Sequence, residues 1–147
     1  HHIPRETEPG GFYHFIDQGI QEFTYRLVPH QGDWPQANPA KHGLELNAPM
    51  LVLEESNHGG HLPATYSGFE VDQPNVLISA IKRHEDGKGY VLRAYEAHGL
   101  AAGCSFKWQQ DREWQTHFKP FEIKTFLIPD EKGQEVVALD LLERPLA

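Results

Sequence analysis

Residues 75–95 contain two strand-like runs joined by a glycine-bearing turn, and they constrain the fold more than any other part of the chain. In the runs VLISAI (76–81) and YVLRAY (90–95), successive side chains fall alternately on two faces, and EDGKG (85–89) lies between them. This pattern predicts a β-hairpin with a glycine turn. Both faces of the first run are largely apolar, which favours a strand covered on both sides. The hairpin itself indicates no chemistry.

Other short segments with alternating or apolar character are expected to form strands bounded by turn residues. They are residues 20–29, 50–54, 64–71, 103–108, 121–129 and 136–142. Repeated short strands of this kind predict an all-β, mainly antiparallel fold of the β-sandwich type. Cys104 alternates with Phe106 and Trp108, so we expect its thiol on the inward face of a strand.

Residues 34–46 are the one stretch with helical spacing, and they predict a single short helix. Asp33 precedes it as a candidate N-cap. Pro39 lies inside this stretch and removes a backbone hydrogen bond unless the helix restarts there. A restart would place Asn38 as the cap and Pro39 in the first turn. The helix is therefore expected to be broken or delayed at this point.

Three ordered segments carry a family resemblance. They are DQG with FTY and PHQGDW (17–34), NVLISAIKRHEDGKGYVLRAYE (75–96) and PFEIKTF (120–126). Together they resemble the C-terminal β-sandwich region of glycoside hydrolase family 38, the α-mannosidases, in its bacterial type. The resemblance extends over nearly the whole chain, and its weight comes from the order of the three segments.

The resemblance implies a fragment of a larger multidomain enzyme. Residues 1–55 would be the terminal part of the large β-domain that follows the catalytic region, and residues 56–147 the small C-terminal sandwich. The parent would hydrolyse α-mannosidic bonds with a divalent metal, commonly zinc, in an N-terminal domain that has no counterpart here. No catalytic residue is therefore expected in this chain. Its partners would be the missing N-terminal domains and the parent's α-mannoside substrate, and its role would be structural.

Composition excludes some functions. The formal charge of −8 disfavours binding to nucleic acid or to anionic membrane surfaces. No apolar run approaches the roughly 18 residues of a membrane span. Cys104 is the one cysteine, so no intramolecular disulfide can form, and the sequence lacks an Asn-x-Ser/Thr acceptor. These features predict a cytoplasmic protein.

Four residues are candidates for carbohydrate contact. Aromatic faces stack on sugar rings while Asp and His hydrogen-bond hydroxyls, which selects His30, Asp33 and Trp34. The structural alternative makes Asp33 a helix cap and packs Trp34 beneath the helix. Trp114 follows a polar connection between strands and is the remaining surface candidate. Two alternatives to a structural role stay open: a carbohydrate-binding module, and a subunit-interaction domain that forms a homo-oligomer.

Metal and carboxylate chemistry have weaker support. His58 and His61 flank two glycines next to Glu54 and Glu55, but flexible glycines fix no geometry, and a mobile surface loop is the simpler interpretation. The acidic clusters Glu54-Glu55, Glu85-Asp86 and Asp140 with Glu143 fall at strand ends or turns, where carboxylates are usually solvated.

Overall fold

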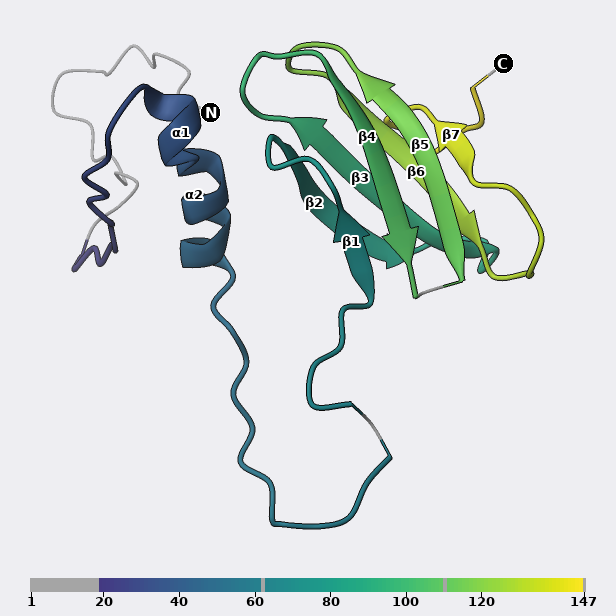
Figure 1. The fold of residues 1–147 in the computed structure, drawn as a ribbon, viewed down its shortest axis with the longest axis horizontal. Helices are drawn as coiled ribbons and strands as arrows, with labels where there is room; N and C mark the ends of the chain where they lie inside the picture. Colours follow the sequence, from purple (N-terminus) through teal and green to yellow (C-terminus); the bar gives the residue numbers. More distant parts are fainter. Residues whose placement is uncertain (1–18, 62, 110, 147) are drawn as a thin grey trace, which may run out of the picture.

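The computed structural model describes residues 19–61, 63–109 and 111–146, which form two facing β-sheets with a broken helix beside them (Figure 1). One sheet has the order β1-β4-β5, and the other has the order β2-β3-β6-β7. The strands are β1 (Phe69–Val71), β2 (Val76–Arg83), β3 (Gly89–Glu96), β4 (Ala102–Trp108), β5 (Arg112–Phe118), β6 (Ile123–Pro129) and β7 (Val137–Leu139). Neighbouring strands are antiparallel. The predicted all-β, mainly antiparallel fold is confirmed.

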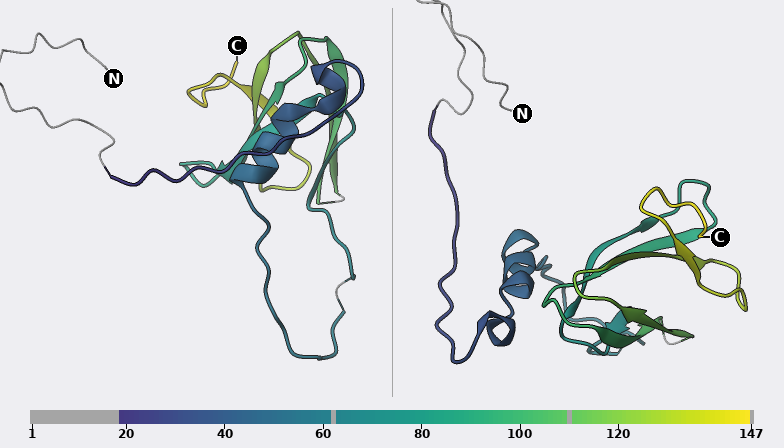
Figure 2. Two further views of the ribbon diagram at one scale, coloured as in Figure 1. Left: turned by 90° about the vertical axis from the view of Figure 1, so that its left-hand side faces the viewer. Right: turned by 90° about the horizontal axis from the view of Figure 1, so that it is seen from above.

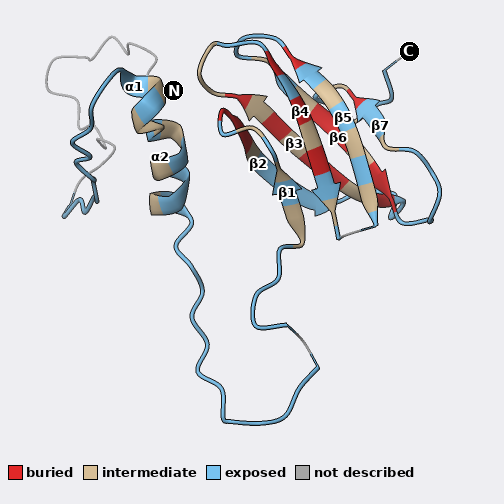
Figure 3. Cartoon of the chain, viewed as in Figure 1, coloured by how far each residue is buried: buried red, intermediate tan, exposed pale blue. Residues whose placement is uncertain are grey.

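The hydrophobic core lies between the two sheets, which appear as separate layers in the right-hand view of Figure 2. Alternate residues of each strand face inward, so Leu92, Phe106, Phe118 and Ile128 are almost completely buried. Burying each of these side chains contributes about 2 kcal/mol to folding. Buried positions concentrate on β3, β4 and β6 (Figure 3). Cys104 is also buried, as predicted, and its burial raises the pKa of the thiol to about 12.

The predicted hairpin is present as β2 and β3. The expectation that both faces of its first strand are covered is wrong, because β2 is an edge strand and is exposed from Ser79 onward. A register shift between Ile78 and Ala80 interrupts the alternation there. β3 takes the covered position instead, between β2 and β6.

Two glycines shape the hairpin turn. Gly87 has φ +70°, and nothing lies within 4 Å of where its Cβ would be. Gly89 has φ +157°, and a Cβ there would collide with the carbonyl oxygen of Ile128. Glycine is therefore required at position 89 by close approach of β6 as well as by backbone conformation.

The other strand predictions met mixed outcomes. The segments predicted at 64–71, 103–108, 121–129 and 136–142 correspond to β1, β4, β6 and β7 with shifted ends, and β5 was not predicted. The strands expected at 20–29 and 50–54 are wrong: these residues are exposed and unpaired. Their alternating pattern suits a strand, but a strand also needs a neighbour for its backbone groups, and no described segment supplies one.

The helical segment is broken at Asn38, as the sequence predicts. α1 (Trp34–Ala37) ends where Asn38 adopts the left-handed conformation with φ 45°. α2 (Pro39–Asn47) then begins with Pro39 in its first turn, and the Asn38 side chain accepts a hydrogen bond from the N–H of Lys41. Neither helix has a buried residue, so the segment depends on a few specific contacts with the sandwich.

Candidate functional site

Asn38 and His98 join the helical segment to the sandwich. The Asn38 amide donates a hydrogen bond to the carbonyl of Pro74, and its Oδ1 lies 3.4 Å from His98 Nε2. The His98 ring also meets the Trp34 indole edge-on, with ring centroids 5.7 Å apart. The turn at Asn38 thus fixes the position of Trp34 relative to the end of β3.

Glu96 organises the loop that carries His98. Its carboxylate is 1% exposed and accepts hydrogen bonds from the Asn75 amide and from backbone N–H groups. The backbone donors belong to His98, Gly99, Leu100 and Phe121. Burial acts to raise the pKa of Glu96, but the bonds from Phe121, Asn75, His98 and Gly99 outweigh it and hold the pKa below its usual value. Glu96 is therefore an ionised, buried anchor for this loop.

A pocket of about 340 Å³ opens beside α1 and α2. Its aromatic and charged lining comes from Arg26, His30, Trp34 and His42. Glu45 lies at its side, with one carboxylate oxygen 3.6 Å from Arg26 Nη1 and 3.3 Å from His42 Nδ1. Trp34 is 47% exposed. An aromatic ring next to donors and an acceptor is the arrangement that recognises a polyhydroxyl ligand.

The structure brings two of the carbohydrate candidates together and separates the other two. His30 and Trp34 line the pocket, whereas Asp33 does not. Asp33 occupies the N-cap position of α1, but its side chain makes no capping hydrogen bond. Arg26, His42 and Glu45 were not predicted from the sequence as site residues. The i, i+3 spacing of His42 and Glu45 on one helical face was the available signal.

Trp114 lies in the sandwich, away from the helices. Its ring stacks on Phe106 with centroids 5.1 Å apart and contacts Phe69 and Phe126 at 6.1 and 5.9 Å. These neighbours occupy the faces that a sugar ring would need for stacking. Trp108 is packed similarly against Tyr90 and Phe69.

The histidine-rich loop shows one contact between an imidazole and a carboxylate. His58 Nε2 lies 3.7 Å from a carboxylate oxygen of Glu55, and His58 Nδ1 lies 3.1 Å from the carbonyl oxygen of Gly59. His61 is exposed. Across residues 19–61, 63–109 and 111–146, no three His, Cys, Asp or Glu side chains gather in a group able to hold a metal ion.

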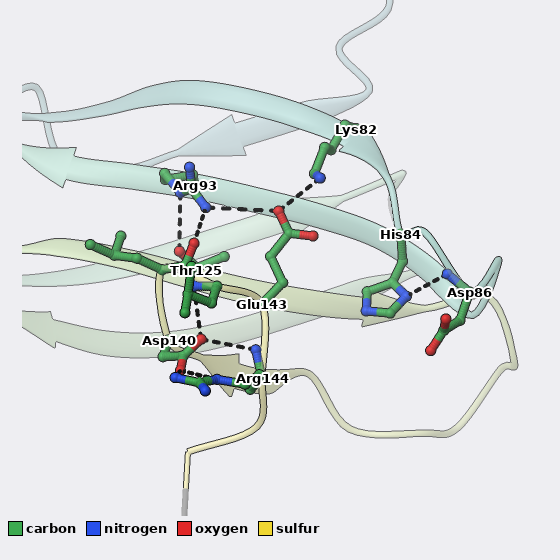
Figure 4. A network of polar contacts seen from close by, with 10 residues as sticks. Lys82, His84, Asp86, Arg93, Thr125, Asp140, Glu143 and Arg144 are labelled. Carbon is green, nitrogen blue, oxygen red and sulfur yellow. Dashed lines mark hydrogen bonds and ion pairs between the residues drawn. The ribbon is translucent and has the colours of Figure 1, made fainter.

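The acidic clusters near the sandwich take part in structural contacts. Glu143 lies 2.8 Å from Lys82 Nζ and 3.8 Å from Arg93 Nη2, and Asp140 pairs with Arg144, so the C-terminal turn is held on the outer face of the β2-β3-β6-β7 sheet (Figure 4). Asp140 also accepts the backbone N–H of Arg144, which with the Arg144 side chain lowers the pKa of Asp140. Asp86 is paired with Lys88.

Comparison with curated proteins finds α-mannosidases. Alpha-mannosidase 2C1 of Homo sapiens is 34% identical over 133 residues, which cover 88% of this chain and 10% of that protein. Alpha-mannosidase 2C1 of Mus musculus is 38% identical over 91 residues, covering 60% of this chain and 9% of that protein. Alpha-mannosidase G of Dictyostelium discoideum is 30% identical over 93 residues, covering 61% and 8%.

The resemblance predicted from the sequence is thereby confirmed, and the chain spans about a tenth of the length of these relatives. No family model matches the chain. No solved structure matches it either. Within the described residues, the helices are too short and too polar to cross a bilayer.

Proposed function

We propose that this chain is the C-terminal accessory part of an α-mannosidase of glycoside hydrolase family 38, and that it braces the β-domain before it. The observation that carries the proposal is the similarity to alpha-mannosidase 2C1, which covers 88% of this chain but 10% of that protein. Because the matching region is about a tenth of a much larger hydrolase, a supporting role for it is favoured. The division into residues 1–55 and 56–147 stays a prediction, and residues 1–18 lie outside the described ones.

The exposed apolar segments before the sandwich support this role. Phe23 and Leu27 are 82% and 83% exposed, and residues 50–53 are exposed to a similar degree. Segments with apolar side chains that pair with none of the described strands are suited to join a sheet supplied by another part of the polypeptide. The helices and the Asn38 contacts would then connect that sheet to the sandwich.

The parent enzyme would retain the anomeric configuration, using two carboxylates about 5–5.5 Å apart and a divalent metal, commonly zinc. We assign neither the carboxylates nor the metal ligands to this chain. A cytoplasmic location also stays a prediction, as does assembly into a homo-oligomer.

The activity of separated parts tests this proposal. The purified 147-residue chain, supplied with zinc, calcium, manganese or cobalt, is expected to release no nitrophenol from an aryl α-mannoside. The longer enzyme that contains it is expected to do so and to lose thermal stability when this region is deleted. Activity from the chain alone, abolished by Glu54→Gln or Asp111→Asn without unfolding, would contradict the proposal. So would a native gene product no larger than this chain.

The pocket at Trp34 favours a second role at the rim of the substrate cleft, because it combines an accessible aromatic ring with polar groups. In the longer enzyme, Trp34→Ala is expected to raise KM for an oligosaccharide more than for an aryl mannoside. Asn47→Ala, at the far end of α2, is the matched control. Equal changes for both substrates would exclude the rim role.

A further inference from the structure

A second cleft, of about 530 Å³, lies at the end of the sandwich between the start of β5 and the β6–β7 loop. Arg112 and Trp114 line it from β5, and Lys132, Gln134 and Glu135 line it from the loop. It is separate from the pocket beside α1 and α2, with which it shares no lining residue.

Two hydrogen-bond donors of this cleft's lining residues have no partner. Arg112 Nη1 and Trp114 Nε1 are both shielded from solvent, and neither has a hydrogen-bond acceptor among the described residues. Arg112 uses its other terminal nitrogen, Nη2, to bind the carbonyl of Glu131 in the loop. Buried donors are normally paired, so two unpaired donors beside one cleft point to an acceptor oxygen supplied from outside the protein.

The loop beside these donors is anchored at Glu131, which accepts bonds from Arg112 and from the Gln134 side-chain amide, whereas its tip at Lys132 has few contacts. The hydrogen bond from the N–H of Gln134 to the carbonyl of Glu131 is long, at 3.4 Å, and Lys132 is 90% exposed with its nearest carboxylate, that of Asp111, 3.9 Å away. A small displacement of the loop, or rotation of the Arg112 side chain, would let an oxygen reach both nitrogens.

The charges around the cleft decide which oxygen fits. Asp111, Glu113 and Glu135 contribute three carboxylates to its lining, against the two cations Arg112 and Lys132. A phosphate or sulfate would be repelled by the carboxylates, and a simple cation could not use the two donors. A sugar hydroxyl accepts from the donors, and its neighbouring hydroxyls donate to the carboxylates.

We propose that this cleft is a binding site for a neutral carbohydrate, held through its hydroxyl groups by Arg112 and the indole N–H of Trp114. The faces of the Trp114 ring are packed against Phe106 and its neighbours, so the contact is made by the edge of the indole and involves no stacking. The proposal rests on donors and charges of the sandwich and does not depend on the role proposed above.

The indole N–H signals provide a direct test. The chain has three tryptophans, so ¹H–¹⁵N spectra of the 147-residue protein contain three indole signals, assignable with Trp→Phe variants. Titration with methyl α-mannoside and with maltose is expected to shift the Trp114 signal saturably in the millimolar range and to leave the Trp34 and Trp108 signals in place.

The Arg112→Gln variant is expected to bind the sugars about tenfold more weakly, since a charge-assisted hydrogen bond is lost. Arg112→Lys, which keeps the charge, should lose less.

Three results would overturn the proposal. One is a Trp114 signal unchanged by every sugar, which would mean that the donors bind water only. Another is a response confined to Trp34, which would place the sugar at the helical pocket. The third is a stronger response to sodium sulfate than to the sugars, which would make the cleft an anion site. Each titration is carried out on the wild-type protein, and the Trp→Phe variants serve only to assign the three signals.

Discussion

The Glu96 carboxylate makes the loop after β3 sensitive to acid. Since its pKa in the folded protein lies below the usual value, its stabilising contribution is complete above the unfolded pKa of about 4.3 and is lost as pH falls through the folded pKa. Glu96→Gln replaces one acceptor oxygen by a donor that faces other donors. We expect it to lower the free energy of unfolding by about 2–3 kcal/mol at neutral pH.

Thermal unfolding of the two proteins across pH measures this effect. The difference in Tm between wild type and Glu96→Gln should be largest near neutral pH and should shrink below about pH 4. A difference that stays constant into acid would show that the charge of Glu96 has no part in stability.

The two turn glycines give a matched pair of substitutions. Gly87→Ala is expected to cost about 1 kcal/mol, because the residue must stay at positive φ in open space. Gly89→Ala is expected to cost at least about 3 kcal/mol, because its Cβ would collide with the backbone of β6 at Ile128. Urea denaturation of both variants checks the order, and equal losses would contradict the close approach of β3 and β6.

At the scale of elements, α2 depends on Asn38. Asn38→Ala removes the helix cap and the hydrogen bond to Pro74, and it places alanine where the backbone is left-handed. We expect it to lower the free energy of unfolding by about 2 kcal/mol. Because α2 has no buried residue, its amides should then exchange with deuterium at nearly unprotected rates. Amides of β3 should be unaffected.

Two further variants separate the causes. Asn38→Gly keeps the backbone freedom without the cap, so its α2 protection should be intermediate. Asn47→Ala removes an exposed bond to the Gly43 carbonyl and serves as the control. If the amides of α2 are equally protected from exchange in all three variants, Asn38 is not the residue that stabilises the helix.

Elements with local causes were predictable from the sequence. The hairpin turn and the restart of the helix at Asn38 follow from glycine, proline and capping chemistry within a few residues. β5 was missed because its inward positions include Arg112 and Thr116, which hide the alternation of Trp114 and Phe118. The segment at 20–29 failed for the opposite reason: its pattern suits a strand, but pairing is decided by distant chain.

The candidate sites were predictable only in part. His30 and Trp34 were identified by residue type, and they lie four positions apart along the chain and line one pocket. The sequence does not predict whether Trp114 faces the core or the solvent. That depends on the register in which β5 pairs with β4 after the turn that follows Trp108. The surroundings of the two unpaired donors could not be predicted either, because they include a loop more than fifteen residues away in the sequence. The bond from Arg112 to Glu131 shows that this loop lies beside them.

For the whole molecule, the exposed segments at 20–28 and 50–53 predict self-association of the isolated chain. Phe23 and Leu27 offer apolar side chains on a segment that pairs with no described strand, which favours pairing between copies. Light scattering should give a mass that rises with concentration, and the double variant Phe23→Ser, Leu27→Ser should reduce this rise without changing Tm. Thr24→Ser is the control on the same segment. A wild-type chain that stays monomeric at all concentrations would contradict the prediction.

The central position of β3 has a consequence for the order of folding. β3 pairs with β2 across a short turn, but its other neighbour, β6, follows only after the chain has crossed to the opposite sheet to make β4 and β5. The two hairpins can therefore form early and independently, on the microsecond scale of local pairing, that is about 1–10 μs. Closure of the sandwich has to wait for β6, whose arrival carries the entropic cost of the longer loop. Docking of β6, followed by β7, is thus expected to limit the rate of folding, and substitutions in the early hairpins are expected to change the folding rate more than the unfolding rate.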